Sequence, residues 1–488
     1  MSNLRALASQ TAAYGLSTII GRTLNYLLVP LYTRLFLPEE YGVVTDLYAL
    51  VAFLNVVFTY GMETAYFRRA NEKSAAAYAT AFWSLTVSSL VFTALLIAGA
   101  NPIAAALRYP EHQEYVVWFA LILGLDALAV IPFARLRQQQ KPLRFVSYKL
   151  INIGLNVGLN LFFLLLLPHW AETGQALALV DALYQPGLGV GYIFLSNLIA
   201  NGVTLLLLVP GFPRFRGHFD PKLWREMFIY GLPLLPAGLA GMVNETFDRI
   251  LLKYLLPGTV NENLYQVGVY GAVYKLAMLM SLFTQAFRTG AEPFFFQHAK
   301  QLGAERLYAR IMNYFVLTGG LIMVGVVLFM DIFKAFLGDA YHEGLGVVPI
   351  LLLANLMLGI YYNQSVWYKL ADKTRYGMWF SLFGAVLTIV LNVLLIPHFG
   401  YYGSAWTTLV VYAAMVVLSY LYGQQHYPVP YALGRLGSYI GLALLLVGVE
   451  LYLLAGHTGY WVWLVRVVLC MAYVMFGIWR EKPFKSVT

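Results

Sequence analysis

The sequence predicts an all-α polytopic membrane protein with about fourteen transmembrane helices. Three observations support this fold class: the composition, the length of the apolar runs and the placement of basic residues between the runs. Hydrophobic residues make up 60% of the 488 positions and charged residues only 11%, whereas a soluble domain carries about twice that share of charge. We therefore expect much of the surface to face lipid.

Each apolar run is long enough to cross a bilayer, which takes about 20 helical residues. Six runs lie in the first part of the chain, near 12–36, 41–64, 78–102, 114–135, 146–168 and 189–211. Six more follow near 226–252, 266–288, 311–334, 346–368, 376–397 and 402–424. The last two lie near 436–455 and 459–480. Arg22 in the middle of the first run argues against a signal peptide.

Basic residues alternate between successive loops. The even-numbered loops and the C-terminal tail are rich in Lys and Arg, among them Arg68, Arg69, Arg135, Arg137, Lys141, Arg144, Lys369, Lys373 and Arg375. Short cytoplasmic loops retain such residues, so both termini are expected in the cytoplasm of a bacterial-type inner membrane. This asymmetry accounts for most of the net charge of +9, and no nucleic-acid partner is expected.

Motifs for metal or nucleotide chemistry are absent from the sequence. It contains no HExxH motif, no Gly-rich phosphate loop and no Cys/His cluster. The single cysteine, Cys470, cannot form an internal disulfide and is expected to pack in a helix. We expect no metal and no other cofactor.

The two halves of the chain resemble each other. Tyr14-Gly15-Leu16 recurs as Tyr230-Gly231-Leu232, Gly61-Met62-Glu63 corresponds to Gly290-Ala291-Glu292, and Asn160 parallels Asn392. The alternative is chance similarity between apolar helices, but the matches occur in the same order in both halves. Two six-helix lobes are predicted at 1–212 and 213–425, followed by two helices and a cytoplasmic tail at 426–488. Six is an even number, so the lobes are related by a parallel pseudo-twofold axis.

Ionisable residues within the predicted spans concentrate on the two spans that open each half. A charge at the bilayer centre costs about 2.5–3.5 kcal/mol, so it is expected to face a cavity or a partner. Cations outnumber acids, which suits an anionic substrate such as a pyrophosphate. The candidate substrate-binding residues of a central cationic cavity are Arg22, Arg34, Arg249, Lys253, Lys275, Tyr26, Tyr48 and Tyr274. The candidates for ion coupling are Asp46, Glu63, Asp126, Glu245 and Asp248.

Local structural roles compete with this interpretation. Glu245 and Arg249 are four residues apart and equally suited to pairing along one helix. Arg34 and Lys253 are also placed to lie at the membrane interface. Asparagines at helical spacing in the fifth and sixth spans are expected to join helices, namely Asn152, Asn156, Asn160, Asn197 and Asn201. Arg466 has no acid near it in the last span, and the sequence leaves its role open.

The most specific segment is the opening of the chain, residues 7–70. It contains Gly21-Arg22, Val29-Pro30-Leu31-Tyr32-Thr33-Arg34-Leu35, Pro38-Glu39-Glu40-Tyr41-Gly42 and Gly61-Met62-Glu63. This segment resembles the polysaccharide transporter (Wzx-type) family of lipid-linked oligosaccharide flippases, in the multidrug/oligosaccharidyl-lipid/polysaccharide (MOP) superfamily. The span count and half-repeat extend the resemblance over the whole chain.

This resemblance implies transport by alternating access around a cationic cavity. The cargo would be an undecaprenyl-pyrophosphate-linked oligosaccharide, the repeat unit of O-antigen, capsule or exopolysaccharide, moved from the inner to the outer leaflet. A polysaccharide polymerase is a further expected partner. Of the family's binding residues, only the first-helix arginine is carried over, onto Arg22.

Three alternatives stay open. One is a lipid II flippase, and another is a multidrug cation antiporter, whose cavity should favour acids and aromatics over cations. The third is a membrane polysaccharide polymerase or ligase, which needs catalytic groups in a large outer loop. The longest outer loop, near 169–188, carries only Glu172 and Asp181 as acids, so we expect no enzyme. The sugar and the coupling ion, whether proton, sodium or the membrane potential alone, are left open.

Overall fold

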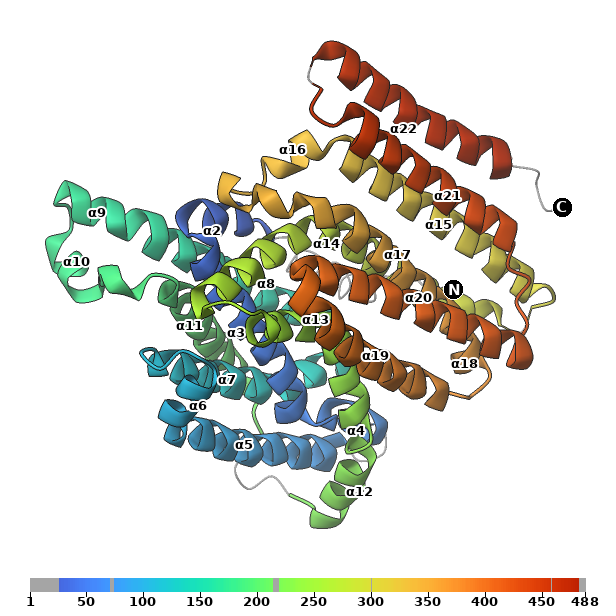
Figure 1. Cartoon of the computed structure of the whole chain (residues 1–488). Helices are drawn as coiled ribbons and strands as arrows, with labels where there is room; N and C mark the ends of the chain where they lie inside the picture. The colour runs from blue at the N-terminus through green and yellow to red at the C-terminus, as the bar shows by residue number, and fades with distance from the viewer. Residues whose placement is uncertain (1–25, 71–73, 214–218, 300, 458, 482–488) are drawn as a thin grey trace. The chain divides into compact units, whose positions relative to one another are not determined.

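A computed structural model describes residues 26–70, 74–213, 219–299, 301–457 and 459–481. The described residues form helices and no strand (Figure 1). Thirteen of these helical segments are long and apolar enough to cross a membrane, and each overlaps one of the last thirteen predicted spans. The first predicted span, 12–36, lies mostly outside the described residues, and α2 (Val29–Leu35) forms its end. The predicted all-helical polytopic fold class is confirmed.

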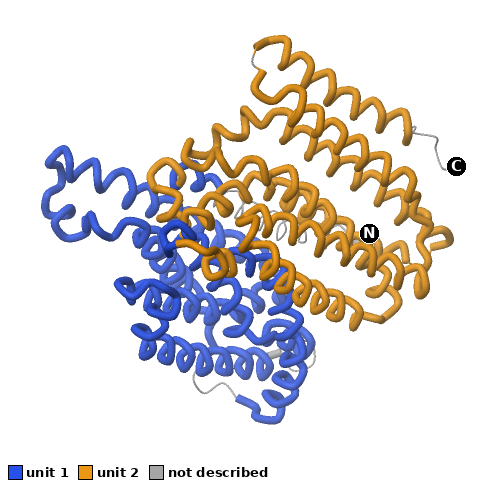
Figure 2. The backbone as a smooth tube through the Cα atoms, in the orientation of Figure 1, with its two compact units in different colours: residues 1–32, 43–250, 259–264 blue, residues 33–42, 251–258, 265–488 orange. Residues whose placement is uncertain are grey.

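The chain divides into two compact units, coloured separately in Figure 2. Unit 1 comprises residues 1–32, 43–250 and 259–264, and unit 2 comprises residues 33–42, 251–258 and 265–488. The boundary crosses helices and does not follow the loop after residue 212. The two units are defined by compact packing, whereas the predicted lobes were defined by the sequence repeat. The lobes at 1–212 and 213–425, with the segment 426–488, therefore stay a prediction.

Unit 1 holds most of the first half. Its main helices are α3 (Pro38–Thr59), α4 (Met62–Ala70), α5 (Ser74–Ala98), α6 (Ala100–Ala106), α7 (Gln113–Gln138), α8 (Pro142–Leu161), α9 (Leu167–Thr173), α10 (Leu177–Leu183), α11 (Gly191–Leu208), α12 (Pro221–Gly231) and α13 (Leu234–Leu255). A π turn at Phe162–Leu166 joins α8 to α9, and a 3-10 turn at Val209–Gly211 follows α11. Helix α7 packs against α5 and α11, and α11 also packs against α8.

Unit 2 holds the second half and the two additional helices. Its helices are α14 (Val260–His298), α15 (Ala304–Leu328), α16 (Met330–Lys334), α17 (Val348–Gln364), α18 (Val366–Leu370), α19 (Arg375–Phe399), α20 (Tyr401–His426), α21 (Leu433–Val449) and α22 (Tyr460–Glu481). Helix α17 packs against α15 and α20, and α20 also packs against α19. This is the pattern of α5, α7, α8 and α11, so the sequence repeat reappears as a repeat of helix pairs.

Helix α12 shows how the sequence defines an amphipathic segment. The Asp220 carboxylate accepts hydrogen bonds from the backbone N–H groups of Lys222 and Leu223, which caps the free donors of the first turn. Pro221 occupies the first helical position, where no N–H is required. Leu223 and Met227 are buried in a cluster with residues of α4 and α5, which fixes α12 within unit 1.

The helix pair α21 and α22 joins unit 2 through α15. Tyr473 of α22 is fully buried and lies over Gly320 of α15, where a Cβ atom would overlap the tyrosine hydroxyl. Gly477 likewise leaves room for Leu317. Small residues that let helices approach closely are a common means of packing within membranes. The last two spans are therefore built onto the third span of the second half.

Candidate functional site

The predicted site residues divide between the two units. Arg22 lies outside the described residues. Unit 1 holds Tyr26, Tyr48, Arg249 and all five ion-coupling candidates, whereas unit 2 holds Arg34, Lys253, Lys275 and Tyr274. Each group is described within its own unit.

A short run of charge lies on α13 in unit 1. Arg249 forms an ion pair with Asp248, at 3.3 Å between Nη1 and Oδ1. The same nitrogen donates a hydrogen bond to the backbone carbonyl of Glu245 at 2.7 Å. Asp248 is buried and Glu245 is exposed, so this ion pair joins adjacent residues. The sequence had left open whether Glu245 and Arg249 pair along the helix or line a cavity.

Asp46 and Tyr48 on α3 lie in polar contacts within the membrane span. Asp46 is fully buried and accepts a hydrogen bond from the Tyr109 hydroxyl at 2.9 Å. The Tyr48 hydroxyl accepts from Asn197 Nδ2 at 2.9 Å. The Tyr48 ring packs on Phe194, with ring centroids 5.7 Å apart. Asp46 is thus bonded to the loop between α6 and α7, and Tyr48 is bonded to α11.

Asp126 belongs to a polar chain that joins α7, α8 and α11. Asn201 donates to Asp126 at 2.9 Å, and Asn152 donates to Asn201 at 3.0 Å and to Thr204 at 2.9 Å. Lys149 is an electrostatic partner of Asp126. Such bonds hold helices together where water is excluded, and they confirm the expected interhelical role of Asn152 and Asn201.

Glu63 opens α4 and forms an ion pair with Arg137 at the end of α7. The Arg137 guanidinium lies 5.2 Å from the ring centroid of Phe67 and 5.7 Å from that of Phe145. A cation over aromatic faces gains electrostatic stabilisation. The pair therefore connects α4 to the segment between α7 and α8.

The equivalent acid of unit 2, Glu292, has the same kind of partner. Lys369 of α18 lies 2.7 Å from Glu292, and Arg288 lies 3.6 Å from it. The Arg288 guanidinium is 4.8 Å from the Tyr362 ring centroid. The Gly-x-Glu repeat therefore places an acid beside a cation from the end of the fourth helix of each half.

Arg34 lies in the segment of α2 that belongs to unit 2. Its side chain is exposed, and Nη2 donates to the Ala335 carbonyl at 2.6 Å. That carbonyl ends α16, where a cation stabilises the unpaired acceptors of the last turn. Thr33 reinforces the junction, because its hydroxyl accepts from the Gly338 N–H at 3.0 Å.

Lys253, Tyr274 and Lys275 lie on the α13 and α14 segments of unit 2. Lys253 is fully buried, and its Nζ is 4.9 Å from the Tyr254 ring centroid. Tyr274 is buried edge-on to Tyr270, with centroids 5.8 Å apart. Lys275 is half-buried. A fully buried ammonium is the most unusual of these features, because Lys side chains are seldom fully buried in proteins.

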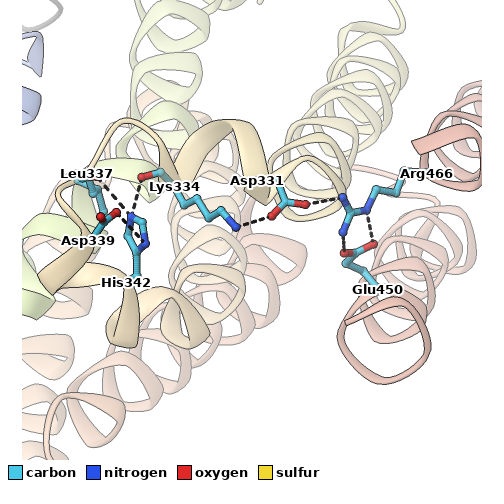
Figure 3. A network of polar contacts seen from close by, with 7 residues as sticks. All are labelled: Asp331, Lys334, Leu337, Asp339, His342, Glu450 and Arg466. Atoms are coloured by element: carbon cyan, nitrogen blue, oxygen red, sulfur yellow. Dashed lines mark hydrogen bonds and ion pairs between the residues drawn. The ribbon is translucent and has the colours of Figure 1, made fainter. Parts of the chain in front are cut away.

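Arg466 anchors a charged network that the sequence did not reveal (Figure 3). It forms a two-pronged pair with Glu450, at 3.1 Å and 2.6 Å, and a third bond to Asp331 at 2.7 Å. Lys334 completes the network at 2.7 Å from Asp331. The Lys334 ammonium and the Arg466 guanidinium lower the pKa of the Asp331 carboxyl. Glu450 and Asp331 are 16 and 135 residues from Arg466, too far along the chain for a spacing argument.

The helix order and the packing define a class: a polytopic helical protein whose fold is similar to that of transporters of the MOP superfamily. A structure of the lipid II flippase MurJ in an inward closed conformation is 12% identical, covers 96% of this chain and 98% of that chain, and has a TM-score of 0.68. An inward-facing multidrug resistance MATE transporter is 14% identical, covers 87% and 95%, and has a TM-score of 0.57. A MATE in the straight conformation is 13% identical, covers 89% and 96%, and has a TM-score of 0.53.

The family follows from the sequence. Residues 7–298 match the family described as "Polysaccharide biosynthesis protein". This match covers more than half of the chain, which belongs to that family. A comparison with curated proteins gives no match. The resemblance inferred from the opening segment is confirmed at the level of family and fold, and the structural neighbours are transporters or flippases by their titles.

Proposed function

We propose that this protein moves an undecaprenyl-pyrophosphate-linked oligosaccharide from the inner to the outer leaflet of the bacterial cytoplasmic membrane by alternating access. The observation that carries the proposal is membership of a polysaccharide biosynthesis family in a chain whose fold resembles that of a lipid flippase. Both termini would be cytoplasmic, and a polysaccharide polymerase would receive the product at the outer leaflet.

The pyrophosphate would be held by the cations of the opening helices. Arg22, Arg34, Arg249, Lys253 and Lys275 are the proposed ligands. Guanidinium groups hold phosphate oxygens in pairs, and an ammonium acts as a point charge. Tyr26, Tyr48 and Tyr274 would contact the sugar rings. The position of Lys253 on the seventh span, one of the two spans that open the second half, supports this proposal.

The energy would come from the membrane. An elementary charge crossing a potential of 100 mV gains about 2.3 kcal/mol, and an interior-negative potential drives an anion outward. Asp46, Glu63, Asp126, Glu245 and Asp248 are the proposed ion-coupling residues. Of these, Asp46 and Asp248 are the most buried, and a carboxylate at such a site responds strongly to protonation or to a bound cation.

The test is a gene deletion followed by mass spectrometry of lipid-linked glycans, with the leaflet of each glycan determined. We expect one undecaprenyl-pyrophosphate oligosaccharide to accumulate on the cytoplasmic side and wild type to clear it. Arg22→Ala, Arg249→Gln and Lys253→Met should clear it at least tenfold more slowly. Lys222→Gln is the matched control, because Lys222 is an exposed cation on α12. An unchanged glycan pool with new sensitivity to cationic drugs would reject the flippase and favour an antiporter.

A lipid II flippase is the second candidate, favoured by the TM-score of 0.68 to MurJ. It predicts a different result from the same experiment. Lipid II would build up on the cytoplasmic side and cell-wall synthesis would stop, while the other glycan lipids would keep their wild-type distribution.

A further inference from the structure

A cavity of about 670 Å³ lies at one end of unit 1, where four helices meet. Its walls come from the first turns of α5 and α8, the last turns of α7, and the end of α11 with the turn that follows. All these helix ends adjoin the basic second, fourth and sixth loops. The positive-inside asymmetry therefore assigns the cavity to the cytoplasmic surface of the membrane.

The lining of this cavity is strongly cationic. Arg135, Lys141 and Arg144 contribute three positive charges, and Tyr78 and Tyr148 contribute hydroxyl groups. Among the described lining residues there is no Asp or Glu. Three cations within one cavity repel each other, so an anion bound between them relieves an unfavourable field.

One wall is held rigidly. The Arg135 guanidinium lies 4.1 Å from the Tyr78 ring centroid and donates to the Gly211 carbonyl at 2.8 Å. The Tyr78 hydroxyl donates to the same carbonyl at 2.8 Å. These contacts join α5, α7 and the turn after α11, so they fix the position of the Arg135 guanidinium in this wall.

The other two cations that line the cavity are exposed. Lys141 and Arg144 begin α8, and Lys141 donates to the neutral side chain of Gln139 at 2.9 Å. Arg137 in the same segment is engaged with Glu63 and does not line the cavity. The sequence assigned all four cations only to membrane topology. The structure separates one that is paired from three that line a cavity.

Exposed apolar side chains occur on two of the helices that line the cavity. Leu143, between the two α8 cations, is 80% exposed, and Leu206 near the end of α11 is 69% exposed. In a membrane-spanning chain such surface faces acyl chains. A cationic hollow beside lipid-facing apolar residues matches a molecule with an anionic head and apolar tails.

We propose that this cavity binds the phosphate group of an anionic membrane lipid from the cytoplasmic leaflet. Lys141 and Arg144 pair with the phosphate oxygens, Arg135 supplies the fixed positive wall, and the acyl chains run along α8 and α11. The site lies wholly within unit 1, and the inference does not depend on the cargo proposed above.

The test uses the purified full-length protein and native mass spectrometry. Short-chain phosphatidylglycerol, phosphatidylcholine and inorganic phosphate are each titrated into wild type, Lys141→Gln/Arg144→Gln and Lys373→Gln/Arg375→Gln. The second double variant is the matched control, because it removes the same two charges from exposed positions in unit 2. We expect the α8 variant to bind phosphatidylglycerol about 30-fold more weakly, since each cation near a lipid surface contributes about a factor of five. The control should bind as wild type does.

Three outcomes would overturn the proposal. Equal weakening in both double variants would mean that net charge, not the cavity, attracts the lipid. Phosphatidylcholine binding as tightly as phosphatidylglycerol would remove the need for an anionic head. Inorganic phosphate binding as tightly as the lipid would identify a soluble-anion site. If the double variant is not monodisperse, Arg144→Gln is compared with Arg375→Gln, and the absence of any difference between them also rejects the site.

Discussion

The second span of each half carries a glutamate at the equivalent position, but the helix is broken near it in unit 1 and continuous in unit 2. In unit 1, the chain breaks between α3 and α4, where Tyr60 and Gly61 adopt φ values of +31° and +72°. In unit 2, α14 runs for 39 residues through the equivalent Gly290. Both backbones nevertheless bring the acid two residues later, Glu63 or Glu292, to a cation of its own unit. The two halves therefore share the ion pair of this glutamate, although they differ in the geometry of the helix that carries it.

The break in unit 1 has a packing cause. A Cβ atom at Gly61 would lie 2.8 Å from the backbone oxygen of Gly231, and a Cβ at Gly231 would lie 2.8 Å from that of Tyr60. A Cβ at Gly290 would meet no atom within 4 Å. Close backbone contact with the α12–α13 junction therefore accompanies the break, whereas α14 has open space at the equivalent position.

A second difference is the charged network of Arg466, which connects α21 and α22 to α16 within unit 2. The sequence repeat includes no counterpart of Arg466 or Glu450 in the first half. Arg466→Met should give the largest loss of stability, about 3–5 kcal/mol, because it removes one partner of a buried ion pair and leaves the buried Glu450 carboxyl without its main hydrogen-bond donor. Thermal unfolding followed by tryptophan fluorescence measures the effect. The double variant Arg466→Met/Glu450→Gln is the control and should recover part of the loss. A single variant as stable as wild type would show that the network does not fasten the helices.

The comparison of glycines should give the next largest effect, with opposite signs in the two halves. Gly61→Ala should cost about 2–4 kcal/mol, because it adds both a positive-φ penalty and a backbone overlap. Gly290→Ala should gain about 0.5–1 kcal/mol, since alanine favours a helix interior where space allows. Unfolding midpoints of the two variants in the same detergent provide the measurement. Equal effects in the two halves would remove the distinction between a broken and a continuous helix.

The ion pairs of Glu63 and Glu292 should differ in how much stability is lost when one cation is removed, because Glu292 has two cations near it. Arg137→Ala should cost about 1–2 kcal/mol, because Glu63 loses a charged partner in a half-buried position. Lys369→Ala should cost less, since Arg288 also lies near Glu292. The prediction is checked by unfolding of both single variants and of Arg288→Ala/Lys369→Ala, which should match Arg137→Ala. If Lys369→Ala alone is as costly as Arg137→Ala, the second cation contributes nothing.

The smallest expected effect is the pH dependence of the stability that Asp331 contributes through its pairs with Lys334 and Arg466. The pKa of Asp331 is lowered in the folded protein, so its contribution to stability is complete above its unfolded pKa of about 4. This contribution is lost as the pH falls further, through the folded pKa. Asp331→Asn should therefore lower the unfolding midpoint at pH 7, and the difference from wild type should shrink as the pH falls below about 4. A constant difference between wild type and variant across this range would mean that the ionised carboxylate is not involved.

The sequence predicted the helices well, because apolar length and basic loops report directly on the membrane. It predicted the repeat from short matches such as Gly61-Met62-Glu63, and the packing pattern follows them. It did not predict the partners of Arg466, which come from distant helices, or the pairing of Arg249 with its neighbour Asp248. Nor could it distinguish the basic residues of one loop. Arg137 finds an acid, whereas Lys141 and Arg144 line a cavity, and this difference depends on helix ends brought together by folding.

The network around Arg466 also has an electrical consequence. Arg466 and Lys334 contribute two formal positive charges, and Glu450 and Asp331 contribute two formal negative ones, so the formal charges of the group cancel. The membrane voltage exerts force in proportion to the charge that moves. If α21, α22 and α16 move together, this network moves no net charge through the membrane field. Voltage sensitivity in transport would then arise from the cargo and from the charges of the opening helices.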